Sequence, residues 1–295
     1  MTTAARPALP QLPLLVLLPL IWALHFAFIK KIGADDDALA ALTALLAGLC
    51  ALYFGALVLN RQLFVFSRDR VIFFLVAGVL AYVVPLGVEM LAAPKIDAAV
   101  LTMIVSLTPV FTVAVAMGLR LIRPALRLIL SVVVGTSGIL LLLLERNTSV
   151  ESPTIWIIIA CLVPLAYAVD ALYVEHFWPT GLNALQVAFG ESLMSLLILL
   201  GLTLLAGVPG SAIGAWFLQT DFLILCVVTA IEVVLFFYLV SRVGAVMVNI
   251  ASFLVLPAGF FWGWLIFDEI ITLAGLGCVI CAVTALQLAR RNAED

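Results

Sequence analysis

An aspartate interrupts an apolar stretch of the chain. Asp170 stands in the segment PLAYAVDALYVEH (164–176), and from 155 to 174 its neighbours are apolar residues, small residues and tyrosines. In a lipid bilayer, a carboxylate at the centre of a helix costs about 2.5–3.5 kcal/mol. Asp170 therefore needs a polar partner, contact with water or a proton.

Two short stripes of polar and aromatic residues could belong to one site. Trp22 and His25 are three residues apart, as are Tyr167, Asp170 and Tyr173, so each set shares one face of a helix. If the imidazole and the carboxyl group approach one another or face a common cavity, they could bind a proton or the charged end of a substrate. The alternative is a structural pair between helices.

Two glutamates, Glu191 and Glu232, also fall within apolar runs that hold no lysine or arginine at similar depth. Each has to face water, find a polar neighbour or be protonated, although Glu191 could also lie nearer an interface. Asn249, eight residues before Pro257, could add a hydrogen bond. Glu89, which flanks a short link, is expected at an interface. The predicted substrate or proton cavity consists of Trp22, His25, Tyr167, Asp170, Glu191, Glu232 and Asn249.

The absence of lysine and arginine from the middle of the apolar runs bears on the substrate. A carrier of sugar phosphates or nucleotide sugars would be expected to offer a cation there. Carboxyl groups, aromatic rings and one imidazole favour neutral, zwitterionic or cationic substrates, such as amino acids or amphipathic metabolites.

Four prolines are predicted to interrupt helices: Pro85, Pro109, Pro164 and Pro257. A proline frees a carbonyl group in the preceding turn, which can bind a substrate or allow the helix to bend during transport. Purely structural kinks are the alternative reading.

The composition identifies the class of protein. Of 295 residues, 66% are hydrophobic and 11% charged, with a mean hydropathy of +1.31. Soluble domains carry about 25% charged residues, so we predict an integral membrane protein. No basic tract with interleaved aromatic residues suggests binding to nucleic acid. The five cysteines lie in apolar runs and are expected to pack as small hydrophobes, and we predict neither a metal nor a cofactor.

Apolar segments long enough to cross a bilayer predict an all-α membrane protein with ten transmembrane helices. The N-terminal segment is too long for the apolar part of a signal peptide and is read as the first span. The ten predicted spans are 13–31, 38–59, 71–90, 97–119, 127–144, 154–175, 182–206, 221–240, 246–267 and 272–289.

The distribution of the 14 lysines and arginines predicts the orientation. With a cytoplasmic N-terminus, the inside set is Arg6, Arg61, Arg68, Arg70, Arg120, Arg123, Arg127, Arg242, Arg290 and Arg291. The outside set is Lys30, Lys31, Lys95 and Arg146. Both termini are therefore expected in the cytoplasm, with the protein in a bacterial-type inner membrane.

The two halves of the chain are similar to one another. PLIWALH (19–25) matches PLAYAVD (164–170) at an offset of 145, and IVSLTPVF around Pro109 matches ASFLVLPAGF around Pro257 at an offset of 148. Because each half is predicted to hold five spans, the second copy crosses the membrane in the opposite direction. Inverted repeats are common in secondary transporters, whose substrate sites lie at the repeat interface.

Three segments of the chain carry a recognisable pattern: WALHFAFIKK, AAVLTMIVSLTPVFTVAVA and GAVMVNIASFLVLPAGFFWGWLIFDEIITLAGLGCVICAV. They resemble the EamA domain of the drug/metabolite transporter superfamily. The resemblance implies a basket-like exporter of ten helices, with a central cavity lined by helices 1–4 and 6–9. Two positions depart from the pattern: Arg120 stands where Glu269 keeps an acidic residue in the second half, and the second span lacks an arginine.

We therefore expect two inverted EamA repeats, 1–146 and 147–295, and no enzymatic activity. The expected function is export of small organic metabolites by alternating access, with proton coupling as one option and an uncoupled facilitator or channel as the alternative. The expected partners are a small-molecule substrate and the lipid bilayer, with no nucleic acid, in a monomer or homodimer.

A remote alternative is an intramembrane serine protease. The segment GTSG (135–138) matches the short G-x-S-G motif of rhomboid-type proteases. Such an enzyme needs a later histidine at similar depth to activate Ser137, and the chain offers only His176, close to an interface.

Overall fold

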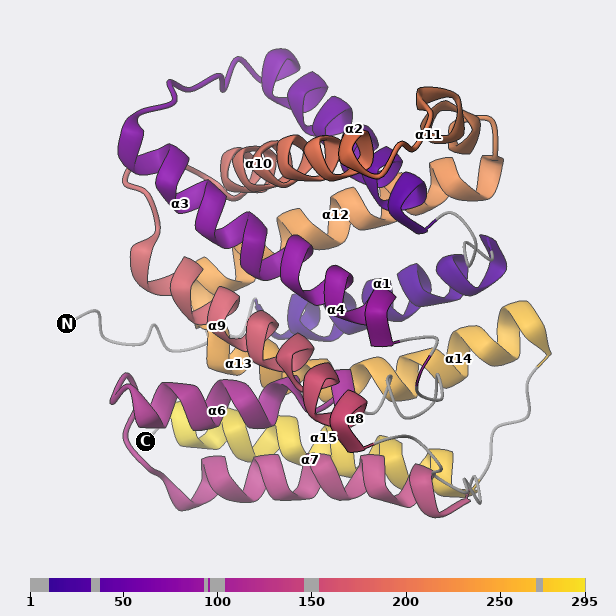
Figure 1. Ribbon diagram of the computed structural model, residues 1–295. Coiled ribbons are helices and arrows are strands. Elements are labelled where there is room, and N and C mark those ends of the chain that lie inside the picture. Colours follow the sequence, from indigo (N-terminus) through magenta and orange to yellow (C-terminus); the bar gives the residue numbers. More distant parts are fainter. Residues whose placement is uncertain are drawn as a thin grey trace.

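The computed structural model describes residues 11–32, 38–92, 95, 104–145, 154–268 and 273–294, and every extended element in these ranges is a helix (Figure 1). The α-helices are α1 (Leu12–Ile32), α2 (Ala38–Leu59), α3 (Arg68–Gly78), α4 (Val84–Ala92), α6 (Thr108–Gly118), α7 (Leu126–Glu145), α8 (Thr154–Ala160), α9 (Leu162–Phe177), α10 (Ala184–Leu205), α11 (Gly210–Trp216), α12 (Thr220–Val243), α13 (Ala245–Ala251), α14 (Val255–Phe267) and α15 (Leu273–Glu294). A π-helix, η2 (Val79–Val83), joins α3 to α4, and a 3-10 helix, η3 (Ser252–Leu254), joins α13 to α14.

The predicted all-helical membrane architecture is confirmed. Eight spans of the described chain are long and apolar enough to cross a membrane, and two shorter apolar helices, Thr108–Gly118 and Leu126–Leu141, accompany them. The predicted span 97–119 is seen only in its second part, since 96–103 lie outside the described residues. The short helix α11, in the link before α12, was not predicted.

In the second half, two membrane spans each consist of two helices, α8–α9 and α13–α14, and each is interrupted a few residues before a proline. Pro164 would have bonded to the carbonyl group of Ala160, where α8 ends before α9 begins. Pro257 stands four residues after Phe253, which lies in the 3-10 helix η3. A proline has no N–H group and its ring crowds the carbonyl four residues earlier, which accounts for both breaks.

Pro85 and Pro109, the prolines of the first half that were predicted to interrupt helices, lie next to a π-helix and at the start of an α-helix. Pro85 follows the π-helix η2, whose wider turn is closed by the N–H group of Val84 bonding to the carbonyl of Val79. Pro109 stands in the first turn of α6, where an N–H group would have no helical partner.

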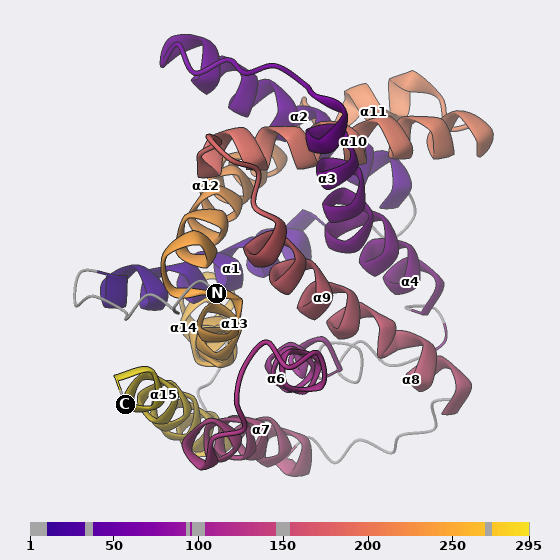
Figure 2. The ribbon, with the colours of Figure 1, turned by 90° about the vertical axis from the view of Figure 1, so that its left-hand side faces the viewer.

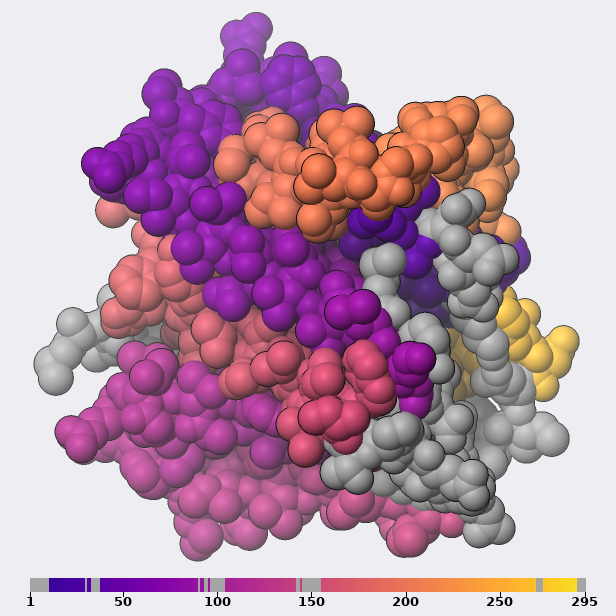
Figure 3. Space-filling view, in the orientation of Figure 1, coloured from indigo at the N-terminus to yellow at the C-terminus, as the bar shows by residue number. Residues whose placement is uncertain are grey.

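The helices form a bundle in which both halves of the chain interleave. α7 and α15 lie side by side along their length at one edge, and α2 and α10 pack together at the opposite edge beside α11 (Figures 1 and 2). Between the two edges, α1 packs on α12 and α14, while α9 packs on α4 and α6. On the face in Figure 3, α10 of the second half lies against α2 and α3 of the first.

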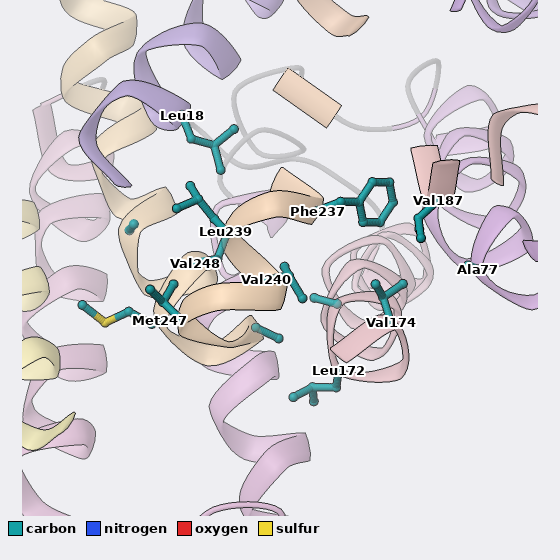
Figure 4. Close-up of a cluster of buried hydrophobic side chains, with 14 of the residues drawn as sticks. Leu18, Ala77, Leu172, Val174, Val187, Phe237, Leu239, Val240, Met247 and Val248 are labelled. Carbon is teal, nitrogen blue, oxygen red and sulfur yellow. The ribbon is translucent and has the colours of Figure 1, made fainter. Parts of the chain in front are cut away.

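The buried core also combines both halves. Phe237 on α12 reaches toward Val187 on α10 and Val174 on α9, and Leu18 and Ala77 belong to the same cluster (Figure 4). The outer surface is apolar as well: large side chains such as Phe54 on α2 are about half exposed. An apolar exterior around a satisfied helical backbone is the arrangement that a bilayer requires.

The GTSG segment serves helix packing. A side chain at Gly135 would overlap the ring of Phe253, and a Cβ at Gly138 would lie 2.9 Å from the Cβ of Cys281 on α15. The hydroxyl of Ser137 donates to the carbonyl of Val134 at 2.7 Å. Small residues let α7 and α15 approach closely, which explains the motif without a protease.

Close approach also decides how α3 packs on α10, and it generates a stability prediction. Gly190 on α10 lies against the buried ring of Phe74, which a Cβ at this position would overlap. Replacing Gly190→Ala is expected to lower the free energy of unfolding by about 1–3 kcal/mol, because the tightly packed ring has to move. Thermal unfolding in detergent measures the effect.

Gly201→Ala is the matched control, since Gly201 lies on the same helix and a Cβ there meets nothing within 4 Å. Equal stability of the two variants would contradict this account of the α3–α10 contact.

Candidate functional site

An imidazole and a carboxyl group meet where α1 packs on α12. His25 Nδ1 lies 2.7 Å from Glu232 Oε1, and the side chains are 16% and 5% exposed. The hydroxyl oxygen of Thr229, one helical turn before Glu232, lies 2.8 Å from the same nitrogen. The imidazole thus takes Glu232 as its partner rather than Asp170, because α1 runs along α12 while α9 lies against α4 and α6.

The same helix pair forms an aromatic contact. The rings of Trp22 on α1 and Phe236 on α12 are 6.0 Å apart between centroids and tilted by 45°. Trp22 is only partly buried. Since Trp22 and His25 share one helix face, α1 presents an aromatic ring and an imidazole side by side to the second half of the chain.

Asp170 and Glu191 form a second acidic pair. Their side chains are almost fully buried, with residues only 3% and 1% exposed, and their carboxyl groups interact electrostatically. Asp170 Oδ1, Glu191 Oε2 and the hydroxyl oxygen of Ser192 are buried without a hydrogen-bond partner. Neither carboxyl group has a cationic partner in the described part of the chain. Unpaired buried groups of this kind are costly, which points to a functional role.

Three tyrosines lie between the His25–Glu232 pair and the Asp170–Glu191 pair. Tyr82 on η2 interacts electrostatically with both pairs, and Tyr167 on α9 does so with Asp170 and Glu232. Tyr53 on α2 donates a hydrogen bond to the carbonyl of Ala230, at 3.2 Å. Phenol groups thus lie among the carboxyl groups from three separate helices.

Glu89 joins this group from α4. The sequence placed it at an interface, but its carboxyl group interacts with His25 and with Tyr167. Tyr53, Tyr82 and Thr229 were not among the residues predicted for the cavity. Tyr82 and Glu89 are seven residues apart and so share a helix face, a signal that could have been read from the sequence. We call the following group of residues the acidic cluster: Glu89, Asp170, Glu191 and Glu232 with His25, Tyr53, Tyr82 and Tyr167.

Asn249 makes a different contact. Its side-chain amide donates to the hydroxyl oxygen of Thr112 on α6 at 2.8 Å, and both residues are buried. Thr112 in turn donates to the carbonyl of Thr108 at 2.8 Å. The bond joins α13 to α6 beside the helix interruptions, and the role of Asn249 in a substrate cavity stays a prediction.

Carboxyl, imidazole and phenol groups can bind protons or cations. Within the described residues, no group of three or more His, Cys, Asp and Glu side chains is placed to hold a metal ion. The five cysteines are free thiols. The chemistry that the acidic cluster offers is therefore exchange of protons and electrostatic recognition of positive charge.

Comparison with known families identifies the domain. The model of the EamA-like transporter family matches residues 10–144. This part of the chain is similar to the EamA-like transporter family. The resemblance seen in the sequence is confirmed over these residues, and the family belongs to the drug/metabolite transporter superfamily. EamA proteins are membrane transporters.

The fold similarity extends over both halves. A protein of known crystal structure superposes with a TM-score of 0.70, at 16% sequence identity, over 95% of each chain. At this identity the likeness concerns the fold alone. The comparison with curated proteins gave no match.

The His25–Glu232 contact generates a second prediction. A double-mutant cycle of His25→Gln and Glu232→Gln is expected to give a coupling energy of about 1–3 kcal/mol, because a buried hydrogen bond to a charged group is worth this much. Denaturant unfolding in detergent micelles measures it.

The exposed pair Lys31–Asp221 provides a control on the same two helices, with Lys31 Nζ 2.8 Å from Asp221 Oδ1. Its side chains are 48% and 37% exposed, so its coupling should not exceed about 1 kcal/mol. If the buried pair couples no more strongly than this one, the assigned contact is wrong.

Proposed function

We propose that this protein is a secondary transporter that exports small organic metabolites by alternating access and is coupled to protons. The observation that carries the proposal is the buried acidic cluster, because groups from α1, α2, η2 and α4 meet groups from α9, α10 and α12 there. Secondary transporters bind their substrates at such interfaces between halves.

The helix contacts support two inverted five-helix repeats, 1–146 and 147–295. If α1 corresponds to α9, α2 to α10, α3–α4 to α12, α6 to α13–α14 and α7 to α15, exchanging the halves maps neighbours onto neighbours. The α1–α12 and α1–α14 contacts become α9–α4 and α9–α6, while α2–α10 and α7–α15 map onto themselves.

Backbone conformation gives the repeat independent support. Arg120 and Asp268, which follow α6 and α14, have φ of 57° and 54°, and they are 268 − 120 = 148 residues apart. Arg61 and Gly207, which follow α2 and α10, have φ of 56° and 71°, at a separation of 207 − 61 = 146. Left-handed residues are uncommon outside glycine, so their recurrence at the offset of the sequence motifs favours a duplication.

Contacts at the ends of the helices support the proposed orientation. Arg70, at the start of α3, donates to the carbonyl of Thr180 beyond α9 at 3.2 Å, which puts these ends on one face of the bundle. Lys31 and Asp221 join the end of α1 to the start of α12 on the other. We propose that the arginine-rich face is cytoplasmic, in an inner membrane, with both termini on that side. A monomer and a homodimer are both compatible with the proposal.

Alternating access gives the buried carboxyl groups a role. A carboxyl group that opens in turn to each side of the membrane can take up a proton on one side and release it on the other. An uncoupled facilitator would share the site and lack this step. The helix interruptions at Pro85, Pro109, Pro164 and Pro257 are proposed to let segments bend during the exchange.

Transport in proteoliposomes tests the proposal. Vesicles are loaded with a mixed pool of amino acids and amphipathic metabolites, and the loss of each compound is followed by mass spectrometry with and without an imposed pH gradient. The gradient is expected to drive selective loss of a few compounds, and Asp170→Asn should slow that loss at least about tenfold, equivalent to about 1.4 kcal/mol. Asp221→Asn, which alters an exposed carboxyl group, should leave the rate unchanged.

Selective loss that ignores both the gradient and the Asp170 substitution would indicate a facilitator. No selective loss of any compound would refute transport of this substrate range.

A further inference from the structure

The acidic cluster carries more acidic than basic groups. Each of four carboxyl groups, from Glu89, Asp170, Glu191 and Glu232, interacts with Tyr82 or Tyr167, and Asp170 and Glu191 also interact with one another, whereas one imidazole, His25, accompanies them. The imidazole is already bonded to Glu232 and lies beside Thr229. Asp170 and Glu191 thus lie together without a positive charge of their own.

Unpartnered atoms mark this pair as a binding position. Asp170 Oδ1 and Glu191 Oε2 are buried and make no hydrogen bond, and neither does the hydroxyl oxygen of the fully buried Ser192. Glu232 Oε2 is also unpartnered, but the other oxygen of Glu232 is bonded to His25. Ser192 approaches Tyr82, which interacts with both carboxyl groups. Polar atoms of Asp170, Glu191 and Ser192 therefore keep spare hydrogen-bonding capacity in the buried interior, where leaving them unpaired costs free energy.

The surrounding tyrosine rings also favour a positively charged ligand. Tyr82, Tyr167 and Tyr53 lie among the carboxyl groups, and Tyr53 has its hydroxyl group occupied by Ala230. The face of an aromatic ring attracts a cation, and quaternary ammonium groups are recognised in this way. Carboxylate and ring faces together favour an alkylated ammonium group over an inorganic ion.

The acidic cluster offers no lysine or arginine that could bind a substrate carboxylate. Cationic side chains such as Lys31 and Arg70 are engaged at the ends of the helices, with Asp221 and with loop carbonyls. A zwitterion or an anion would bring a negative charge into a cluster that holds no lysine or arginine to balance it.

We propose that Asp170 and Glu191, with Ser192 and the tyrosine rings, bind the ammonium group of a monovalent organic cation, and that binding releases a proton from this pair to the solvent. The inference rests on the proposed transport function, of which it names the substrate class. Two carboxyl groups buried side by side cannot both carry a charge without a cation, so the cation and the proton compete for the same position.

Titratable groups from all the packed elements enter this balance. They are His25 on α1, Tyr53 on α2, Tyr82 on η2, Glu89 on α4, Tyr167 and Tyr173 on α9, Glu191 on α10 and Glu232 on α12. Glu232 is held by His25, so Asp170 and Glu191 are the pair from which the proton leaves.

Calorimetry with three probes that share a benzene ring tests the charge preference. They are phenyltrimethylammonium (a permanent cation), phenylalanine (a zwitterion) and benzenesulfonate (a permanent anion). Binding to the full chain in detergent is measured in buffers of different ionisation enthalpy, so that the same titrations count the protons released. The cation is expected to bind at least about tenfold more tightly than the other two probes and to release a proton.

Asp170→Asn and Glu191→Gln keep the shape of the side chains and should each weaken cation binding at least about tenfold and reduce the proton release. Asp221→Asn, outside the cluster, should change neither quantity. Two isosteric variants guard against the misfolding of one of them.

Equal or tighter binding of phenylalanine would overturn the cation preference, as would the absence of cation binding at millimolar concentrations. Cation binding that survives both cluster substitutions would overturn the assigned site. Cation binding with proton release, but without gradient-driven transport of the same probe in proteoliposomes, would uphold the inference and refute the proposed transport function.

Discussion

Burial of carboxyl groups among membrane helices is the constraint on which the rest of the structure depends. Each such group has to be neutralised, hydrogen-bonded or given access to water. Glu232 meets this demand through His25, 2.7 Å away on another helix. Asp170 and Glu191 have no such basic partner within the described residues, and each keeps a buried oxygen without a hydrogen bond, as Glu232 does at Oε2. The contrast separates a paired carboxyl group, which joins α1 to α12, from a pair with capacity left to bind.

The scaffold around the cluster is made of two kinds of contact. Glycines let helices approach closely, as Gly190 does beneath Phe74 and Gly138 does beneath Cys281. Prolines interrupt the helices that approach the cluster, as at the π-helix before Pro85 and the break before Pro164. Tight contacts hold helices together, while interrupted helices have free carbonyl groups and are easier to bend. A transporter that alternates between two openings needs both properties.

The sequence carried the class of fold and much of the site composition. Hydropathy alone predicts a helical membrane protein, because a bilayer accepts few other backbones, and the EamA resemblance was visible in short motifs. The residue types that matter, Asp170, Glu191, Glu232 and His25, stood out because charge is costly in hydrocarbon. The offset between similar segments of the two halves was also visible, because the segments around Pro109 and Pro257 both keep a proline.

The sequence alone determined which side chains require an explanation, and the tertiary structure decided how they combine. Spacing along one helix shows a shared face, but the partner on another helix depends on which helices pack together. His25 therefore met Glu232 and Thr229 instead of Asp170. Glu89 turned inward for the same reason. Asn249 took Thr112 as its partner through the contact between α13 and α6. Neighbours between helices follow from packing, which no spacing within one segment encodes.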